Sequence, residues 1–481
     1  MIEKTKSQSG KSEVRKTAYL IGIKGIGMTA LAIFLKQSGY EVSGSDVSEF
    51  FPTDEILKEA KIPVTNGFNP ENLKSIKPDL IVVSAAYGQD NPEVKIARKR
   101  HLPLSYYSEA LGQISSGKRV IAIAGIHGKT TTAALLSFIL EKAGLDPSFI
   151  IGATKVTGLR NIAKKGEGEY FVLEADEYRK SPENNQAKFL DLSSQIAVIS
   201  SIELDHPDVY PSIEEIYNAF YVLACRIPRN GFIVLCLDYP KAKKLRRSLA
   251  DRDFETYGFD LAAQWKIVNV QEAGETNFSL NNNGKIIGPF SLKLKGRHNV
   301  LNATAAILVA QKLGIQEKTI KKYLSQFSGV KRRFEEIGRI GQIVVIDDYA
   351  HHPTAINLTL EAVKKNFPRN KIYCIFQPHT YSRTEKLLKE FGSAFKNADE
   401  VLITDIFSSA REKEGKISGA DLAMEIKKNQ SKVRFIDDWG KVLNYLEDTI
   451  EGPSVIITMG AGDIYKLTEK ILEYFEIRKN E

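Results

Sequence analysis

The sequence predicts an α/β protein of three domains, because of its length and two patterns along the chain. Short apolar strands alternate with helices towards both ends, which is typical of parallel, Rossmann-like sheets. Between these regions, an apolar strand at 119–124 runs straight into a glycine-containing loop and a helix. The chain has 481 residues, and at about 100–200 residues per domain this length predicts two to four domains.

The first domain is expected at 18–117 as a Rossmann-like sheet, after a flexible tail at 1–17 that mixes basic and acidic side chains. A strand at 18–23 leads into a glycine turn and an apolar-periodic helix at 26–38. Further strands are expected at 41–46, 80–84 and around Leu104. The small and polar residues at 115–118 predict a linker to the next domain.

The second and third domains are expected at 118–330 and 331–481. Strands of the central domain are expected at 119–124, 170–173, 196–200 and 232–235, with a β-rich stretch at 254–294 and helices at 130–142 and 299–313. Asn281-Asn282-Asn283-Gly284 predicts a hairpin turn in the β-rich stretch. Strands of the third domain are expected at 342–346, 371–376, 400–404, 432–436 and 454–459, with helices between them. This alternation predicts a second doubly wound unit.

Composition and charge exclude several classes of protein. The chain is 43% apolar and 26% charged, as in ordinary globular proteins, and its net charge of +8 suits anionic ligands such as nucleotides. It has no concentrated Lys/Arg stripe, so no nucleic-acid partner is expected. Lys24 interrupts the apolar stretch at 18–35, which favours strand, turn and helix over a signal peptide, and no apolar run could span a bilayer. Cys225, Cys236 and Cys374 form no disulfide or metal pattern, so a reducing cytoplasm is expected.

The strongest functional motif is the loop Gly125-Ile126-His127-Gly128-Lys129-Thr130-Thr131-Thr132, which lies between a strand and a helix. Backbone N–H groups in such a loop, together with the helix N-terminus, can cradle phosphate oxygens. Lys129 would neutralise the β- and γ-phosphates of ATP, and the Thr130 hydroxyl would bind Mg²⁺. The motif therefore predicts an ATP site.

Two polar runs follow later strands of the central domain. Glu174-Ala175-Asp176-Glu177 comes directly after the strand at 170–173, where acids beside a phosphate loop can hold Mg²⁺ on ATP. Glu203-Leu204-Asp205-His206 follows the strand at 196–200. His206 could bind a second divalent ion or meet a substrate, and a structural histidine is the alternative.

Two more polar runs follow strands of the third domain. Asp347-Asp348-Tyr349-Ala350-His351-His352-Pro353 follows the strand at 342–346, and Gln377-Pro378-His379-Thr380-Tyr381-Ser382-Arg383 follows the strand at 371–376. Because ligands bind at the carboxyl ends of strands in doubly wound sheets, these runs predict a site for sugar hydroxyls and proton transfer. Arg383 could bind a small carboxylate through its guanidinium. Each run alone could also be a solvated loop.

The glycine turn Gly22-Ile23-Lys24-Gly25-Ile26-Gly27 fits the pyrophosphate of a nucleotide. Counted from Gly25, it continues to Ala30, where the dinucleotide-binding pattern G-x-G-x-x-G has its last glycine. NAD is therefore not the expected ligand, and a purely structural turn is the alternative.

Taken in order, these motifs resemble those of the Mur ligase family of peptidoglycan synthesis, over nearly the whole chain after the tail. The resemblance implies three domains that bind, in order, a UDP-sugar, ATP and an amino acid. It implies an ATP-dependent ligase that makes a cell-wall precursor. Within the family, the motifs are most similar to members that join L-alanine to the lactyl carboxylate of UDP-N-acetylmuramate through an acyl phosphate. Such members release ADP and phosphate.

The resemblance also implies roles for individual residues. UDP-sugar contacts would be Gly25, Ile26, Gly27, Ser45, Asp46 and Ser84. ATP contacts would be Gly125, Ile126, His127, Gly128, Lys129, Thr130, Thr131, His298, Asn302, Arg332 and Asp348. Ligands of two Mg²⁺ sites would be Thr130, Glu174 and His206. The L-alanine pocket would contain Tyr349, His351, His379 and Arg383, and the catalytic residues would be Lys129, Glu174, His206, His351 and Arg383.

Several positions depart from the family's pattern. Lys24 replaces a usual Gly, Ile126 replaces a usual Thr, and Ser200-Ser201 replaces a usual Thr-Asn. Glu177-Tyr178 also occurs in a related ligase that recycles a whole tripeptide onto UDP-N-acetylmuramate. That recycling reaction is the first alternative, although the run that ends at Arg383 is similar to that of alanine-adding members.

Alternatives from other classes of protein predict different biochemical observations. A P-loop NTPase that couples hydrolysis to motion would hydrolyse ATP without an amino acid. A nicotinamide dehydrogenase would use the first glycine turn and would need no Gly-Lys-Thr motif. A non-catalytic sugar-nucleotide binder would leave the later acids and histidines unexplained. A monomer or weak homodimer is expected for the ligase.

The expected mechanism depends on positioning and on charge neutralisation. The substrate carboxylate attacks the γ-phosphorus of ATP in line, while Lys129 and Mg²⁺ neutralise the phosphates. A second ion at His206 would shield the carboxylate from the phosphate that it attacks. The incoming amine must be neutral, so a base is needed, and His351 and His379 are both candidates.

Replacing the loop lysine tests the ATP site. Lys129→Ala should lower ATP-dependent ligation by about 100-fold or more, because the charge that stabilises the transferring phosphate is lost. Steady-state phosphate release measures the change, and circular dichroism should show an intact fold. Activity equal to that of the parent chain would remove the phosphate-loop assignment.

Overall fold

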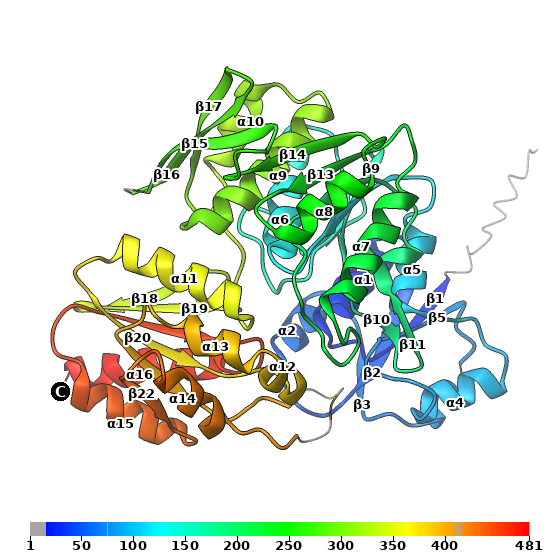
Figure 1. Ribbon diagram of the computed structural model, residues 1–481. Helices are drawn as coiled ribbons and strands as arrows, with labels where there is room; N and C mark the ends of the chain where they lie inside the picture. Colours follow the sequence, from blue (N-terminus) through cyan, green and yellow to red (C-terminus); the bar gives the residue numbers. More distant parts are fainter. Residues whose placement is uncertain (1–15, 75, 273, 409–411, 413–414, 481) are drawn as a thin grey trace, which may run out of the picture.

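The computed structural model describes residues 16–74, 76–272, 274–408, 412 and 415–480. Three successive parts of the chain, here called the N-terminal, central and C-terminal units, each have their own main sheet with helices packed on it (Figure 1). The predicted α/β class is therefore confirmed. Residues 1–15 of the predicted tail lie outside the described residues. Within the described residues, no helix is both long and apolar enough to cross a bilayer.

The N-terminal unit has a parallel sheet in the order β3-β2-β1-β4-β5. Its strands are β1 (Thr17–Ile21), β2 (Glu41–Asp46), β3 (Val64–Asn66), β4 (Leu80–Val83) and β5 (Leu104–Tyr106). Its helices are α1 (Ile26–Gln37), α2 (Pro52–Glu59), α3 (Glu71–Lys74), α4 (Pro92–Lys99) and α5 (Tyr107–Ile114). The order reverses at β1, so the carboxyl ends of β1, β2 and β4 form one edge where a ligand can bind.

The sheet of the central unit runs in the order β17-β16-β15-β14-β13-β12-β6-β9-β7-β8. Its strands are β6 (Arg119–Ala124), β7 (Ser148–Ile150), β8 (Ala163–Lys164), β9 (Tyr170–Ala175), β12 (Ser194–Ile199), β13 (Phe232–Cys236), β14 (Phe254–Gly258), β15 (Trp265–Gln271), β16 (Thr276–Asn282) and β17 (Lys285–Leu292). The predicted hairpin turn is confirmed, since Asn282 pairs with Lys285 across Asn283 and Gly284. The β-rich stretch therefore extends the parallel sheet as antiparallel strands.

Helices and one separate hairpin complete the central unit. The helices are α6 (Lys129–Lys142), η1 (Lys188–Asp191), α7 (Ile213–Arg226), α8 (Pro240–Ser248), α9 (Arg297–Lys312) and α10 (Glu317–Leu324). The hairpin consists of β10 (Arg179–Ser181) and β11 (Asn184–Ala187). Its turn residue Glu183 accepts hydrogen bonds from Gln89 N (2.6 Å) and Tyr106 Oη (3.3 Å), so the hairpin docks onto the N-terminal unit.

The C-terminal unit has a sheet in the order β18-β19-β23-β20-β21-β22, parallel except for the edge strand β18. Its strands are β18 (Glu335–Ile340), β19 (Ile343–Asp348), β20 (Lys371–Phe376), β21 (Glu400–Ile403), β22 (Val433–Phe435) and β23 (Ser454–Met459). Its helices are α11 (Pro353–Asn366), α12 (Tyr381–Lys386), α13 (Leu388–Ala394), α14 (Gly419–Lys427), α15 (Trp439–Thr449) and α16 (Tyr465–Asn480).

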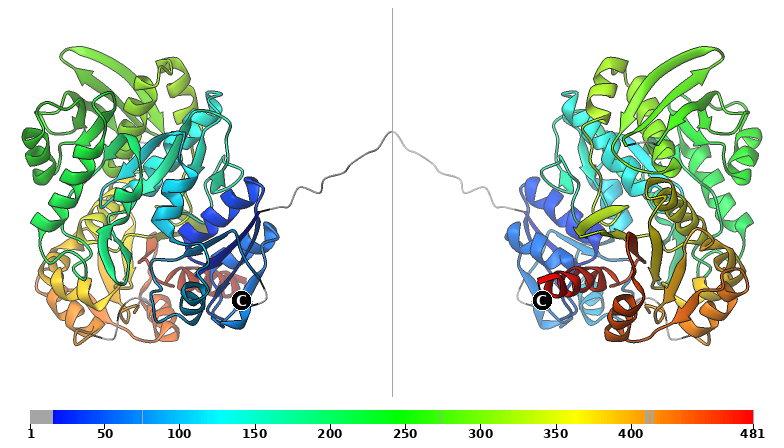
Figure 2. Two further views of the ribbon diagram at one scale, coloured as in Figure 1. Left: turned by 90° about the vertical axis from the view of Figure 1, so that its right-hand side faces the viewer. Right: turned by 90° about the vertical axis from the view of Figure 1, so that its left-hand side faces the viewer.

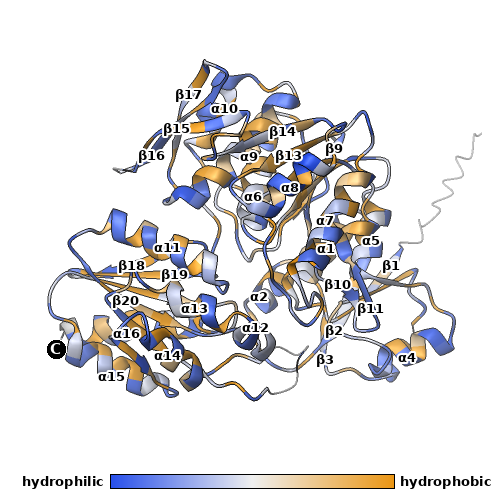
Figure 3. Ribbon diagram, in the orientation of Figure 1, coloured by the Kyte–Doolittle hydropathy of each residue, from blue (hydrophilic) through white to orange (hydrophobic). Residues whose placement is uncertain are grey.

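The parallel strands are apolar on both faces because helices cover both faces of each sheet. In β12, Ala197 and Ile199 belong to one buried cluster, whereas Ile196 and Val198 belong to another on the opposite face. Figure 3 shows the same division at β13, whose residues are all apolar, beside the largely hydrophilic helix α8. Continuous apolar runs made these strands recognisable in the sequence.

Short or polar strands were missed by the sequence prediction. β7, β8, β10 and β11 have two to four residues each, and β11 is formed by Asn184-Asn185-Gln186-Ala187. β18 contains two Glu, a Gly and an Arg, and it pairs only with β19, as expected for an edge strand. Their pairing comes from tertiary contacts that local periodicity does not carry.

The C-terminal unit docks onto the central unit through the segment Glu203-Leu204-Asp205, which follows β12. Thr354 Oγ1 donates to Glu203 Oε1 (2.9 Å), and His352 Nε2 lies 3.1 Å from the carbonyl oxygen of Leu204. Arg383 Nε donates to Asp205 Oδ1 at 2.7 Å, and both side chains are almost fully buried. Figure 2 shows the two units one above the other from two sides. We call these three residues the docking segment.

Removing the buried charge of the docking segment should loosen this arrangement. Asp205→Asn leaves the Arg383 guanidinium without its counter-ion, and breaking a buried pair costs about 3–5 kcal/mol. Small-angle X-ray scattering should therefore report a larger radius of gyration. The matched control is Lys365→Ala, because Lys365 forms a longer and more exposed pair with Glu272 (3.6 Å), worth about 0–1 kcal/mol. A scattering profile unchanged by Asp205→Asn would contradict the importance of the buried pair.

Candidate active site

The phosphate-type loop is formed where β6 ends at Ala124 and α6 begins at Lys129. Gly125 (φ 128°) and Gly128 (φ 79°) have positive φ values that favour glycine. Side chains would also not fit, since a Cβ would lie 2.1 Å from Ser200 Oγ at Gly125 and 2.1 Å from Asn302 Oδ1 at Gly128. The sequence therefore fixes a tight loop whose backbone N–H groups and helix N-terminus can receive anionic oxygens.

Hydroxyl groups hold the loop against β12. Ser201 Oγ accepts a hydrogen bond from His127 N (2.9 Å), and Ser200 Oγ donates to the carbonyl oxygens of Ala124 (3.1 Å) and His127. Ile126 N donates to the carbonyl oxygen of Ser201 (3.4 Å). The departures at Ile126 and Ser201 thus lie where the loop is anchored. Ile126 packs against the apolar cluster that includes β12.

Lys129 is held by the carboxylate of Glu177, the last acid of the predicted acidic run 174–177. Its Nζ donates to both oxygens of Glu177 (2.9 and 2.8 Å) and to the Gly125 carbonyl oxygen (2.6 Å). Burial alone would lower the pKa of Lys129, but Glu177 and Asp176 outweigh burial and raise it, so the ammonium stays charged. A phosphate that binds Lys129 must share it with Glu177 or displace that carboxylate.

Thr130 and Glu174 meet beside the loop, as the sequence predicts for residues that share a site. Parallel pairing of Ile123 with Glu174 sets the two strand ends side by side. Thr130 Oγ1 donates to Glu174 Oε2 (2.9 Å), and Gly152 N donates to Glu174 Oε1 (2.6 Å). Burial raises the pKa of Glu174 above its usual value. A hydroxyl and a carboxylate are oxygen ligands that suit Mg²⁺.

His206 lies in a second cluster beside the first. Its Nε2 is 3.4 Å from Glu177 Oε1 and 3.7 Å from Asp205 Oδ2, and its ring packs against Tyr178. Asp176, Glu177 and His206 could offer ligand atoms that all lie within 4.8 Å of one another. The predicted metal residue His206 therefore lies with Asp176 and Glu177 rather than with Glu174. The acidic run 174–177 was the signal for these two acids.

A further group of possible ligands spans the units. His127 Nε2 lies 2.9 Å from Glu203 Oε2, and the rings of His127 and His352 are 4.7 Å apart. His352 is already engaged, because its Nδ1 accepts from Thr354 N (3.3 Å) and its Nε2 faces the Leu204 carbonyl oxygen. These contacts give His352 a role in docking.

Two of the predicted ATP contacts, His298 and Asn302, lie on α9, which packs against α6. Asn302 Nδ2 donates to Asn299 Oδ1 (3.2 Å), and the Asn302 side chain borders Gly128 of the loop. Burial lowers the pKa of His298 to about 4, so its imidazole is neutral at neutral pH. Among the described residues, His298 Nδ1 has no hydrogen-bond partner, which leaves it available to a ligand.

The basic run before β18 directs Arg333 to the phosphate-type loop, whereas the predicted ATP contact was its neighbour Arg332. Arg332 Nε pairs with Asp347 (3.1 Å), and its Nη2 donates to the Gly460 carbonyl oxygen (2.8 Å), so its guanidinium faces its own unit. Arg333 Nη2 instead reaches Thr130 Oγ1 (3.4 Å) across the units. Adjacent residues point in different directions here, and Arg332 has a φ of 61°. Sequence alone could not choose between them.

Asp348 shapes the turn that carries the predicted amino-acid residues. It accepts hydrogen bonds from Phe334 N (2.6 Å) and Ala350 N (2.7 Å). Burial raises its pKa to about 6, and Arg333 opposes that shift. The Arg333 guanidinium lies over the Tyr349 ring, acts electrostatically on Asp348 and also reaches Thr130 beside the phosphate-type loop.

The four predicted amino-acid contacts lie together. The rings of Tyr349 and His351 are 5.4 Å apart, and those of His351 and His379 are 6.0 Å apart. Arg383 Nη1 donates to the His379 carbonyl oxygen (2.9 Å) and lies 3.2 Å from His379 Nδ1. Because Asp205 already occupies Nε of Arg383, a substrate carboxylate would have to bind another part of the guanidinium or exchange with Asp205.

The predicted UDP-sugar residues share one edge of the N-terminal sheet. Asp46 accepts hydrogen bonds from Lys24 N (2.7 Å) and Tyr87 Oη (3.2 Å), and burial raises its pKa. Lys24 itself turns to Asp54 (3.1 Å) and the Glu49 carbonyl oxygen (2.9 Å). The other predicted residues lie at the ends of neighbouring strands or in the first glycine turn, namely Gly25, Ile26, Gly27, Ser45 and Ser84. Ser45 Oγ donates to Glu93, a partner that was not predicted.

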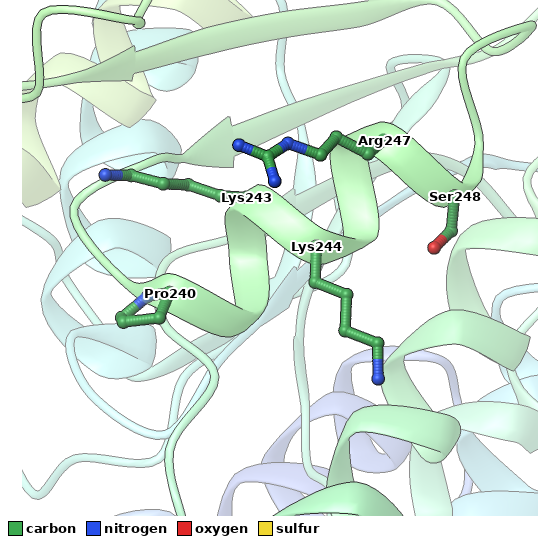
Figure 4. Close-up of a pocket in the computed structure, with 5 residues that line it drawn as sticks. All are labelled: Pro240, Lys243, Lys244, Arg247 and Ser248. Carbon is green, nitrogen blue, oxygen red and sulfur yellow. The ribbon is translucent and has the colours of Figure 1, made fainter.

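A separate surface cavity of about 440 Å³ lies over α8. Figure 4 shows Lys243, Lys244 and Arg247 extending from this helix beside Pro240 and Ser248. Lys243 pairs with Asp260, and Lys244 pairs with Glu214 (2.9 Å), so these two lysines of the cavity have carboxylate partners. None of the predicted site residues lines this cavity.

The three units also match models of known protein domains. Models of the Mur ligase family match residues 17–119 ("Mur ligase family, catalytic domain"), 123–310 ("Mur ligase middle domain") and 332–462 ("Mur ligase, glutamate ligase domain"). The UDP-N-acetylmuramate–L-alanine ligase of Desulfitobacterium hafniense is 39% identical over 94% of this chain and 99% of its own, and that of Caldanaerobacter subterraneus is 38% identical over 95% and 97%.

Solved structures give the same result. The UDP-N-acetylmuramate–alanine ligase of Thermotoga maritima has a TM-score of 0.79 at 26% identity, over 96% of this chain and 99% of that one. A murein peptide ligase of Psychrobacter arcticus has a TM-score of 0.71 at 24% identity, over 96% and 98%, and shows the shared fold. The fold, the arrangement of the motifs and the full-length similarity agree: the chain belongs to the Mur ligase family.

Proposed function

We propose that this chain joins L-alanine to the lactyl carboxylate of UDP-N-acetylmuramate in peptidoglycan synthesis, with ATP converted to ADP and phosphate. Relatives named as UDP-N-acetylmuramate–L-alanine ligases are 36–39% identical to it over 94–96% of its length. The structural observation that carries the proposal is the docking segment. It holds Arg383, a candidate carboxylate ligand, at the junction between the central and C-terminal units, where the phosphate-type loop also lies.

ATP and two Mg²⁺ sites are proposed for the junction of the central and C-terminal units. Lys129 and the loop N–H groups would receive the phosphates, while Thr130 and Glu174 suit one Mg²⁺ and His206 with Asp176 and Glu177 suits a second. Bound Mg²⁺ would neutralise phosphate charge and polarise the P–O bonds. Arg333, which already reaches Thr130, would add a positive charge from the other unit.

The first chemical step in this proposal is phosphoryl transfer. A carboxylate oxygen of UDP-N-acetylmuramate attacks the γ-phosphorus, the bond to the β-phosphate oxygen breaks, and ADP leaves with its electron pair. Both reactants are anions, so their approach requires the positive groups Lys129 and Arg333. The product is an acyl phosphate, whose carbonyl carbon can accept an amine.

The amino acid would bind on the C-terminal side of the junction. Arg383 would bind the carboxylate of L-alanine, with Tyr349, His351 and His379 around it. The pocket size cannot separate L-alanine sharply from glycine or serine, because one methylene changes binding by only about 1–3 kcal/mol. The uridine diphosphate part would bind at the strand ends of the N-terminal unit, near Asp46.

The tripeptide-recycling reaction and the motion-coupled NTPase remain the alternatives to test. The pair Glu177-Tyr178 suggested the recycling reaction as an alternative. Both residues have partners within the central unit, since Glu177 binds Lys129 and Tyr178 Oη donates to Asp208 (2.6 Å). These contacts explain the pair without a tripeptide. A cytoplasmic location fits a reaction that consumes ATP, and a monomer or weak homodimer is the proposed state.

Phosphate release with defined substrates tests the proposed function. Purified protein with ATP and Mg²⁺ should release phosphate only when both UDP-N-acetylmuramate and L-alanine are present, and mass spectrometry should detect the new amide. Glycine, L-serine and the tripeptide serve as parallel acceptors. Release that requires the tripeptide would move the chain to recycling, and release without any acceptor would favour the NTPase.

A further inference from the structure

The hydrogen-bond partners of the histidines at the junction of the units show which ring nitrogen carries the hydrogen in a neutral imidazole. A neutral imidazole has one N–H group and one nitrogen lone pair, and the partner of each nitrogen decides which is which. His101 lies in the N-terminal unit, and the other six histidines lie around the phosphate loop and the C-terminal strand ends: His127, His206, His298, His351, His352 and His379. Only a lone pair can accept a proton from a substrate.

The N–H group of His351 faces a backbone carbonyl oxygen of its own unit. Its Nδ1 lies 2.8 Å from the carbonyl oxygen of Tyr349, and a carbonyl oxygen can only accept a hydrogen bond. Nδ1 therefore carries the hydrogen, and the lone pair is on Nε2. Among the described residues, nothing donates a hydrogen bond to Nε2 of His351, and its ring is partly exposed.

His379 has the opposite tautomer. Its Nδ1 lies 3.2 Å from Nη1 of Arg383, and a guanidinium has no acceptor, so Nδ1 of His379 holds the lone pair. That lone pair is therefore engaged by the guanidinium of Arg383. His379 thus fits a role in orienting Arg383, to which its carbonyl oxygen also binds (2.9 Å).

The remaining histidines are engaged or lie elsewhere. His352 uses Nδ1 as an acceptor from Thr354 N and Nε2 as a donor to the Leu204 carbonyl oxygen. His127 and His206 place Nε2 against the carboxylates of Glu203 (2.9 Å) and Glu177 (3.4 Å). His298 lies on α9 beside Gly296, apart from the cluster around Arg383.

The charges around His351 keep it neutral before substrates bind. Burial, Arg383 and His379 lower its pKa well below the usual range, while Asp205 and the hydrogen bond to Tyr349 oppose them. A substrate carboxylate on Arg383 and the phosphate of an acyl phosphate would each add negative charge. Both would favour the protonated imidazole, so the basicity of His351 would rise when the reactants are in place.

We propose that Nε2 of His351 accepts the proton from the ammonium group of the incoming amino acid. This inference rests on the proposed ligase function. The resulting neutral amine attacks the acyl carbon and a C–N bond forms. The bond between the acyl carbon and the phosphate oxygen breaks, and its electron pair stays on the leaving phosphate. That phosphate takes the second amine proton, and the imidazolium returns its proton to solvent.

The test compares nucleophiles in the variant His351→Asn. The Asn amide can replace the donor to the Tyr349 carbonyl oxygen, but it has no basic nitrogen at the Nε2 position. Ligation of L-alanine at neutral pH should fall by about 10²–10⁴-fold in kcat, the usual contribution of a general base. Hydroxylamine is mostly neutral at that pH and needs no base. The rate of hydroxamate formation from the acyl phosphate should therefore fall far less than the rate of L-alanine ligation.

Two comparisons separate this role from a structural one. His379→Asn should mainly raise the KM for L-alanine, because it disturbs Arg383, and the two variants should differ in this split between kcat and KM. The loss in His351→Asn should shrink as pH rises, because free L-alanine becomes neutral. Equal losses with L-alanine and hydroxylamine, or no loss with L-alanine, would overturn the proposal. Absence of acyl phosphate in the parent chain would instead reject the ligase function itself.

Discussion

The buried ion pair between Arg383 and Asp205 is the interaction on which the composite site depends. Parallel pairing already brings the phosphate loop, Glu174 and the docking segment to one edge of the central sheet. The pair then fixes the C-terminal strand ends against that edge. Since burying two charges costs desolvation energy, such a pair adds little net stability, and its value here is position. Its neighbours Glu203 and Leu204 make the remaining contacts of the docking segment.

The cations of the site are matched by carboxylates of the chain itself. Glu177 binds Lys129, and Asp205 binds Arg383. Arg333 lies close enough to Glu174 and Asp348 to influence both carboxyl groups. This matching keeps the positive groups charged and oriented within a mostly buried junction. Anionic substrates would then exchange with carboxylates at prepared positions, and the net charge of the site would change little during binding.

The sequence was sufficient for much of the fold because apolar runs and glycine turns are local signals. It predicted β20, β23 and the Asn283-Gly284 turn within a residue or two. It could not choose Arg333 over Arg332, since backbone direction at adjacent residues depends on tertiary contacts. It also did not predict that Glu177 would bind Lys129 or that Asp205 would bind Arg383, because these partners are 48 and 178 residues apart. The site assignments therefore stay predictions, now with defined contacts.

Oxygen transfer from substrate to phosphate tests the central claim most directly. UDP-N-acetylmuramate with both carboxylate oxygens labelled as ¹⁸O would be converted with ATP and L-alanine, and the phosphate analysed by mass spectrometry. An acyl-phosphate ligase must move one labelled oxygen into the released phosphate, while the other remains in the amide carbonyl. Phosphate that contains no ¹⁸O after complete conversion would contradict the account, because ATP would then have been cleaved without activating the carboxylate.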